Sequence, residues 1–167
     1  MQLARTALSG FRRDRPSLSR VFEGACRDII RDLAVTRASI WFFSSAGTAI
    51  TCACEVDERT GQVMQGETLE ESACPAYFAA IRRDHRVVAD DVMAHPDTVC
   101  LADSHLRAHG VRSLLDHVVI ADGRPMAVLC AEQCGEPRSW TSADEEYLFQ
   151  MATLLGVAFQ TRIELAA

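Results

Sequence analysis

The chain has 167 residues, of which 49% are hydrophobic and 24% charged, with a net charge of -6 and an isoelectric point near 5.3. This length suits one domain, and a chain of this size buries roughly 70% of its unfolded surface. The acidic balance argues against nucleic acid as a partner. No run approaches the ~20 apolar residues of a membrane span, and the N-terminus lacks the apolar core of a secretory signal. We therefore expect a cytoplasmic protein with reduced thiols.

The chain divides into an N-terminal arm, residues 1–16, and a single domain, residues 17–167. Arginines crowd the first twenty positions, and we interpret this stretch as a solvated arm rather than a docking site. Apolar residues then recur at steps of three and four from Leu18 to Leu33. That spacing predicts a helix over residues 17–33, with Ser17 as its cap.

The next part of the chain predicts an alternation of strands and short helices. Residues 37–43 and 49–55 are rich in strand formers and predict a hairpin. The polar stretch 57–72 predicts a long loop. Pro75 suits the first turn of a helix that ends near Asp84, and residues 86–89 predict a brief strand.

Two further helices are predicted from their end signals. Asp97 can cap a helix that runs to about residue 109, with Gly110 as its stop. Thr141 can cap the last helix, and Asp144 completes an acidic variant of the capping box. The buried stripe of that helix is predicted to consist of Leu148, Met151, Ala152, Leu155 and Phe159.

The dipeptide Asp122-Gly123 between two apolar runs is the strongest hairpin signal in the chain. A regular two-residue turn would place Leu115 opposite Cys130 and Ser113 opposite Glu132. Because side chains alternate between the faces of a sheet, one face would then be mixed in polarity and the other aliphatic. The mixed face is predicted to hold Ser113, Leu115, His117, Val128, Cys130 and Glu132. We expect a small-molecule cavity on that face and helix packing on the other.

Helices outside a run of hairpin-linked strands indicate an α+β fold. Several segments also carry a family resemblance: residues 37–41, 74–78, 88–91 with 95–98, and the closing run 112–116, 122–123, 129–132 and 138–141. In this order and spacing they resemble a GAF domain, of the kind found in bacterial sensor kinases and cyclic-dinucleotide signalling proteins. The resemblance implies a central antiparallel sheet of five or six strands with long N- and C-terminal helices on one face. It also implies a ligand cavity under short helices and loops on the other face, and dimerisation through the terminal helices.

Candidate ligand-binding residues follow from the predicted cavity and its roof: Tyr77, Phe78, Asp90, His105, Ser113, Leu115, Cys130 and Glu132. For Glu132 we weigh orientation of a ligand or pairing with a buried cation against a strand end near solvent. Asp116 would lie on the apolar face, where a buried carboxylate needs a partner, and we expect Arg138 to brace it. Asp90 has an alternative role in the turn it begins.

The seven cysteines include no C-x-x-C pair, so neither a disulfide framework nor a standard zinc site is supported. Cys52 and Cys54 share one strand face and are interpreted as core residues. No metal or cofactor is required by the sequence.

The resemblance implies a sensory and regulatory module that catalyses no reaction of its own. It also implies that the module binds an unidentified small molecule and forms a homodimer. Its output domain or signalling partner is absent from this chain. One alternative is a free methionine sulfoxide reductase, with Cys74 and Cys100 as its thiols. Another is a bilin photoreceptor, although the cysteine that would precede His105 is replaced by Ser104.

Overall fold

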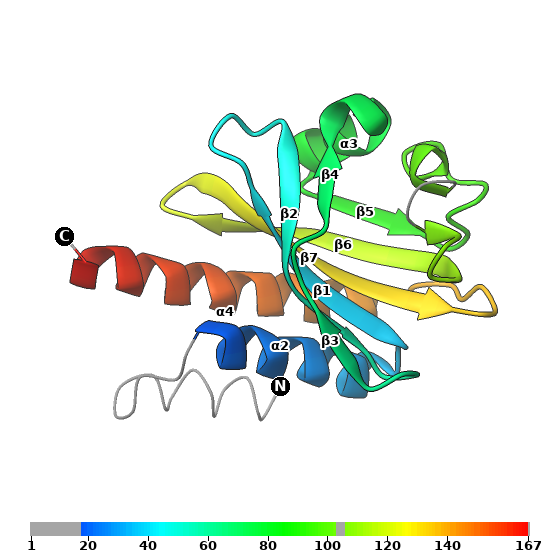
Figure 1. Cartoon of the computed structure of the whole chain (residues 1–167), viewed down its shortest axis with the longest axis horizontal. Coiled ribbons are helices and arrows are strands. Elements are labelled where there is room, and N and C mark those ends of the chain that lie inside the picture. Colours follow the sequence, from blue (N-terminus) through cyan, green and yellow to red (C-terminus); the bar gives the residue numbers. More distant parts are fainter. Residues whose placement is uncertain (1–17, 103–105, 167) are drawn as a thin grey trace.

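The computed structural model describes the backbone of residues 18–102 and 106–166, and the side chains of these segments up to residue 160. A seven-stranded antiparallel sheet forms the centre, in the order β3-β2-β1-β7-β6-β5, with β4 pairing to β2 off this path. Two long helices lie along one face, and a short helix with irregular segments covers the other (Figure 1). The predicted N-terminal arm lies outside the described residues, as do Ser17, the predicted cap of the first helix, and His105.

The elements follow the chain from one terminal helix to the other. The strands are β1 (Arg37–Phe43), β2 (Ala49–Asp57), β3 (Gln62–Met64), β4 (Thr68–Glu70), β5 (Arg86–Ala89), β6 (Val111–Ala121) and β7 (Arg124–Cys134). The helices are α2 (Leu18–Leu33), α3 (Pro75–Asp84) and α4 (Ser142–Ala166), with the 3-10 turns η1 (Glu71–Ala73) and η2 (Val99–Leu101). The α+β class and the terminal helices on one face are thus confirmed.

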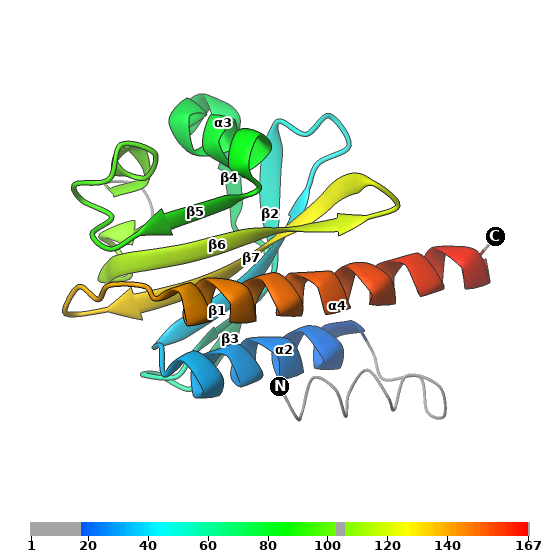
Figure 2. The same cartoon turned by 180° about the vertical axis from the view of Figure 1, so that it is seen from behind.

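The sheet separates two hydrophobic cores. On one side α2 and α4 run alongside each other beneath the sheet (Figure 2), and α4 buries Leu148, Met151, Ala152, Leu155 and Phe159 as predicted. On the other side α3 and the segment around η2 cover a second core that includes Trp41, Phe78, Leu114 and Val128. No helix among the described residues has the length and apolar character needed to cross a bilayer.

Two predicted segments differ from the structure. The stretch 57–72 is not one long loop, because β3 and β4 both pair with β2 within it. The helix predicted over 97–109 is also wrong as an α-helix. Its described part contains the 3-10 turn η2, and the Arg107 amide donates to the Ala102 carbonyl, five residues back instead of the four of an α-helix. Asp97 caps nothing there, and its own amide donates to the ring of His95. Gly110 ends the segment at a φ of 69°, as expected of a stop.

The β6–β7 hairpin contains the predicted turn but not the predicted register. Asp122 and Gly123 both have positive φ, 50° and 68°, which is the two-residue turn expected of Asp-Gly. Ala121 then pairs with Arg124 and Ile120 with Pro125, but Val119 pairs with Ala127, so Met126 is an extra residue. This bulge shifts the pairing by one position from Val119 to Ser113, and a second irregularity restores the register at Val111. Asp116, not Leu115, lies opposite Cys130, and Leu114, not Ser113, lies opposite Glu132.

Helix α4 begins at the predicted capping box and later approaches the sheet unusually closely. The Asp144 amide donates to Thr141 Oγ1 at 3.2 Å, and the Thr141 amide donates to Asp144 Oδ2 at 2.9 Å. Further along, Gly156 lies against β6, where an added Cβ would be 2.2 Å from the carbonyl oxygen of Ile120. Only a residue without a side chain fits at this crossing.

Candidate functional site

A cavity of about 260 Å³ lies on the face of the sheet opposite α2 and α4. Its floor comes from β1, β2, β6 and β7, and its sides from β4, η1, α3 and η2. The lining residues are Trp41, Ile50, Glu67, Thr68, Leu69, Glu70, Ala73, Tyr77, Leu101, Leu106, Leu114, Asp116, Cys130 and Glu132. Most of the lining is apolar, and the polar side chains that line this space are four carboxylates, the Tyr77 phenol, the Thr68 hydroxyl and the Cys130 thiol. Such a hollow, mainly apolar with few polar groups, suits a small organic molecule.

Asp116 supplies the most unusual polar group of the floor. Its side chain is buried, with only 1% exposed, and Oδ2 accepts a hydrogen bond of 2.5 Å from the Tyr77 hydroxyl on α3. Its other oxygen, Oδ1, is buried and has no hydrogen-bond partner. Burial raises the pKa of Asp116 to about 7, although Tyr77 and Cys130 oppose the rise. A carboxyl group beside a hollow therefore has an unused acceptor.

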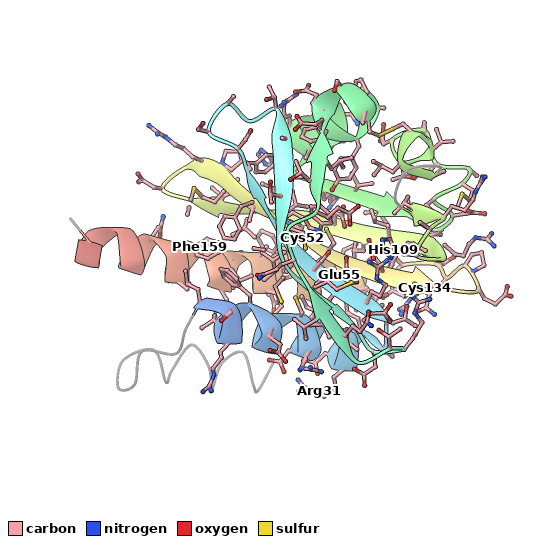
Figure 3. All side chains as sticks on the ribbon, in the orientation of Figure 1. Arg31, Cys52, Glu55, His109, Cys134 and Phe159 are labelled. Carbon is pink, nitrogen blue, oxygen red and sulfur yellow. A yellow bond between two sulfur atoms is a disulfide. The ribbon has the colours of Figure 1, made fainter. Side chains whose placement is uncertain are left out.

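Glu132 is held by a buried arginine that the sequence reasoning overlooked. Arg37 is fully buried, and its Nη1 lies 3.1 Å from Glu132 Oε2 while its Nη2 lies 2.5 Å from Glu55 Oε1. Asp57 is a third, longer contact at 3.8 Å, and Arg59 pairs with it from the outside at 2.7 Å. Burial alone would lower the pKa of Arg37, but Glu132 and Glu55 raise it above its ordinary value. Glu55 is labelled in Figure 3, on β2.

Of the roles weighed for Glu132, its contacts fit pairing with a buried cation, here the protein's own Arg37, and not a strand end near solvent. The position of Arg37 at the start of a strand, one place before a run of apolar residues, was the available signal for its burial. Its partners come from β2 and β7, the two neighbours of β1 in the sheet. The sequence around Arg37 gives no sign that residues of those two strands would be its partners.

The predicted site residues divide into two groups. Tyr77, Cys130 and Glu132 line the cavity. Leu115 was placed on the wrong face, because the bulge turns it toward α2 and α4, where it joins their core. Phe78 is completely buried in the core under the roof and does not line the cavity.

Ser113 and Asp90 fasten the far end of the sheet to the segment before α4. The Ser113 hydroxyl donates to the Asp90 carbonyl at 2.7 Å and accepts from the Arg138 amide at the same distance. Asp90 Oδ1 accepts from the Trp140 amide at 3.0 Å. Neither residue lines the cavity. The contacts of Asp90 fit the alternative role in a turn that was considered for it.

The brace predicted between Asp116 and Arg138 does not form. Arg138 lies 4.6 Å from the centre of the Trp140 ring and donates to the Leu33 carbonyl and to Asp144. The register shift explains the difference, since Asp116 lies on the cavity face while Arg138 follows β7 on the side of α4. Asp116 finds its partner on the roof instead.

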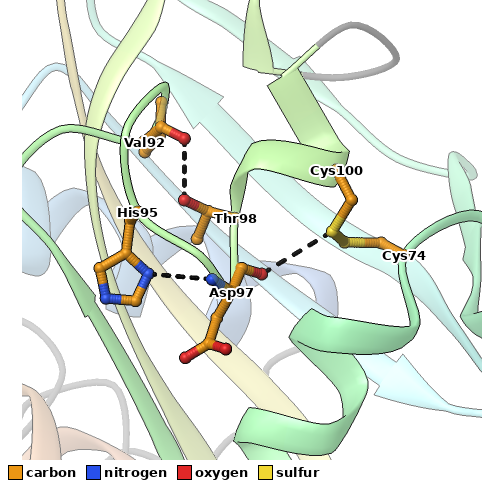
Figure 4. The surroundings of a disulfide bond; sticks show 6 residues. All are labelled: Cys74, Val92, His95, Asp97, Thr98 and Cys100. Carbon is orange, nitrogen blue, oxygen red and sulfur yellow. Dashed lines mark hydrogen bonds between the residues drawn. A yellow bond between two sulfur atoms is a disulfide. The ribbon is translucent and has the colours of Figure 1, made fainter.

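A disulfide joins Cys74 and Cys100, whose Cα atoms are 5.3 Å apart (Figure 4). The prediction of reduced thiols is wrong for this pair. Cys74 directly follows Ala73 and Cys100 directly precedes Leu101, and both of those neighbours line the cavity. Close by, the Thr98 hydroxyl donates to the Val92 carbonyl at 2.9 Å and holds the η2 segment in place. The bridge therefore ties together two walls of the hollow.

The other cysteines are Cys26, Cys52, Cys54, Cys130 and Cys134, all buried and free. Cys52 and Cys54 are core residues, as predicted, but they do not share one strand face. An irregularity in the β1–β2 pairing between Cys52 and Cys54 places Cys54 in the core beside α2 and α4 and Cys52 in the core on the cavity side. Burial, followed by the nearby Asp116, raises the pKa of Cys130 well above its ordinary value, so its thiol stays protonated at neutral pH. Within the described parts of the chain, no three histidine, cysteine or acidic side chains are grouped to hold a metal ion.

Comparison with known proteins agrees with this architecture. The GAF domain family model matches residues 17–159. Among solved structures with the same fold is GAF3 of a Synechocystis sp. PCC6803 protein in its photoproduct state, 20% identical, covering 90% of this chain and 98% of that one, with a TM-score of 0.68. The GAF domain of a phosphoenolpyruvate-protein phosphotransferase from Acinetobacter is 14% identical and covers 99% and 95%, with a TM-score of 0.71.

A third similar structure is an enzyme. It is the free methionine-R-sulfoxide reductase of Neisseria meningitidis with its substrate, 18% identical, covering 98% of this chain and 89% of that one, with a TM-score of 0.73. At these identities the three structures share the fold with this chain. No curated protein matches the sequence.

Proposed function

We propose, since the chain belongs to the GAF domain family, that it is a sensory and regulatory domain of bacterial signal transduction. A small molecule enters the cavity, and the terminal helices carry the response to an output domain or partner. The pathway would be two-component or cyclic-dinucleotide signalling.

The observation that carries this proposal is the placement of the cavity relative to α4. Leu114 and Asp116 of β6 line the hollow, while Leu115 and Val119, on the opposite face of the same strand, pack in the core with α4. A ligand that binds two packings of this strand unequally shifts the balance between them. The helix lies one side-chain layer from the ligand, and a change at the floor reaches it without an intermediary.

Dimerisation through the terminal helices is part of the proposal. Phe149, Thr153 and Val157 recur every fourth residue of α4 and are exposed, with 48% of Phe149 and 56% of Val157 accessible. Positions four apart share one side of a helix, so the three form a stripe. Two copies of this stripe would bring the α4 helices of two subunits together.

Native mass spectrometry of freshly purified protein tests the proposal, because it reports retained ligand and subunit count together. We expect a dimer, part of which carries an added small-molecule mass that is lost on mild activation. Hydrogen exchange of α4 with and without that molecule then measures the response. Unchanged exchange along α4 and β6 at saturation would contradict the signalling role.

The reductase alternative has one observation in its favour, the bond between Cys74 and Cys100 beside the cavity. In such a reaction two thiols reduce a sulfoxide to methionine and water and become a disulfide. Turnover of free methionine sulfoxide with a thiol reductant, compared with Cys100→Ser, decides between the two functions. The photoreceptor alternative has less support, because a bilin needs a free thiol for attachment and Cys100 is already bonded to Cys74.

A further inference from the structure

The charges around the cavity are almost all of one sign. Four of its lining residues are acidic: Glu67 and Glu70 near the exposed edge formed by β4, and Asp116 and Glu132 on the floor. Among the described residues that line it there is no lysine, arginine or histidine. An anion placed here would meet carboxylates on several sides.

The one arginine behind the floor does not reverse this sign. Arg37 is shared by Glu132, Glu55 and Asp57, and Arg59 adds a second positive charge through Asp57. Two guanidinium groups thus face three carboxylates in this cluster. Glu132 is neutralised where it stands, and the cluster leaves no surplus positive charge for a ligand phosphate or carboxylate.

Asp116 provides an acceptor, Oδ1, that no protein group meets with ordinary hydrogen-bond geometry, although the Cys130 thiol on the facing strand also interacts with this carboxyl. Oδ1 is buried without a hydrogen-bond partner, in a side chain that is 1% exposed and lines the cavity. Leaving such a buried group unpaired is unfavourable, and more so when it is charged. A ligand N–H group that reached Oδ1 would remove this cost. Since burial holds the Asp116 carboxyl partly protonated near neutral pH, a positive ligand would also favour its ionised form.

The remaining lining residues indicate what kind of ligand body would fit the cavity. Trp41 and Ile50 rise from the floor, and Leu101, Leu106 and Leu114 complete an apolar enclosure. A volume of about 260 Å³ corresponds to about nine water molecules at ~30 Å³ each. This volume suits a compact molecule with an apolar or aromatic body.

We propose that the cavity takes a small organic cation, an ammonium or amidinium group on a compact apolar body, with Asp116 Oδ1 as the acceptor of its N–H. The inference rests on the proposed function, since it names the ligand class of the same cavity. The apolar walls take the body, and Glu67 and Glu70 raise the local concentration of positive ligands at the mouth.

Three probes of one shape test the charge. These are 2-phenylethylamine, the neutral 2-phenylethanol and the anionic phenylacetate, each titrated calorimetrically into the unaltered protein at mildly alkaline pH. We expect the amine to bind at least about tenfold more tightly than the alcohol, as a charged hydrogen bond predicts, and the anion not to bind. Equal or tighter binding of the alcohol or the anion overturns the inference. Failure of all three to bind overturns it as well.

A substitution at Asp116 tests whether this residue causes the preference for the amine. Asp116→Asn should reduce the preference for the amine over the alcohol about tenfold, while Glu136→Gln, at an exposed position after β7, should leave it unchanged. If Asp116→Asn does not fold, the comparison of probes in the unaltered protein still decides. The proposed function fails separately: it falls if α4 does not respond to the retained molecule, whatever the charge of that molecule.

Discussion

Tyr77 on the roof and Asp116 on the floor are joined by a hydrogen bond of 2.5 Å, so a single contact spans the cavity from α3 to β6. The bond uses one oxygen of a carboxyl group that is otherwise buried. Burial raises the pKa of Asp116 from its ordinary value of 3.8 to about 7. The protonation of this one group should therefore be visible in the stability of the whole domain.

The first prediction concerns pH. Between the two pKa values the folded protein keeps a proton on Asp116 that the unfolded chain releases, so its contribution to stability is complete below about pH 4 and is lost as pH rises through about 7. Asp116→Asn removes this dependence. Urea unfolding at about pH 5 and about pH 8 should show the variant gaining on the unaltered protein by a few kcal/mol, roughly 1.4 per pKa unit. Parallel profiles for the two proteins would exclude a raised pKa at Asp116.

The second prediction concerns the buried arginine. Arg37→Met leaves Glu132 and Glu55 buried without their counter-charge, and removal of one partner from a buried ion pair costs about 3–5 kcal/mol. Chemical unfolding at neutral pH measures the loss. Arg83→Met is the matched control, because Arg83 pairs with Asp84 at the surface and should contribute about 1 kcal/mol or less. A similar small effect for both variants would mean that the buried carboxylates do not depend on Arg37.

The third prediction concerns Gly156, where alanine should destabilise the protein although it usually stabilises a helix. Alanine in place of a helical glycine usually stabilises by about 1 kcal/mol. At Gly156 the added methyl would meet the Ile120 carbonyl oxygen, so Gly156→Ala should instead destabilise by about 1–3 kcal/mol as α4 is pushed from β6. Gln150→Ala, at an exposed position earlier in α4 and outside the proposed dimer stripe, should be neutral or slightly stabilising. Thermal unfolding compares the two, and a stabilised Gly156→Ala variant would show that α4 is not held at this crossing.

The fourth prediction concerns the disulfide. Cys74 and Cys100 are 26 residues apart, and a loop of this size predicts a stabilisation of roughly 3 kcal/mol. Reduction with dithiothreitol should lower the unfolding midpoint by roughly 6–12 °C. The double variant Cys74→Ser, Cys100→Ser should start from the lower midpoint and ignore the reductant. If the reductant acts equally on both proteins, its effect comes from elsewhere.

The sequence predicted the order of the elements well because their signals are local. The stripe of α2, the Asp-Gly turn and the capping box of α4 each depend on residues within a few positions of one another. The short strands β3 and β4 were missed for the opposite reason. Their side chains are mostly exposed, and pairing with β2 rather than their own pattern makes them strands.

The floor of the cavity could be predicted only in part. Alternation placed Cys130 and Glu132 correctly along β7, but the face of β6 depends on a single extra residue, Met126. Pro125 was a usable hint, since proline has no amide to donate to a ladder and is confined to strand ends and bulges. The partners of Arg37 could not be foreseen, because they come from strands far apart in sequence.

The bulge at Met126 also determines how directly β6 connects the cavity to α4. Because of it, β6 presents Asp116 to the hollow and, four residues later, its Ile120 carbonyl to the bare backbone of Gly156. If the domain works as proposed, the ligand contact at Asp116 and the helix contact at Ile120 lie at the two ends of one five-residue stretch of β6. A change in the twist of this stretch would then move α4 at Gly156.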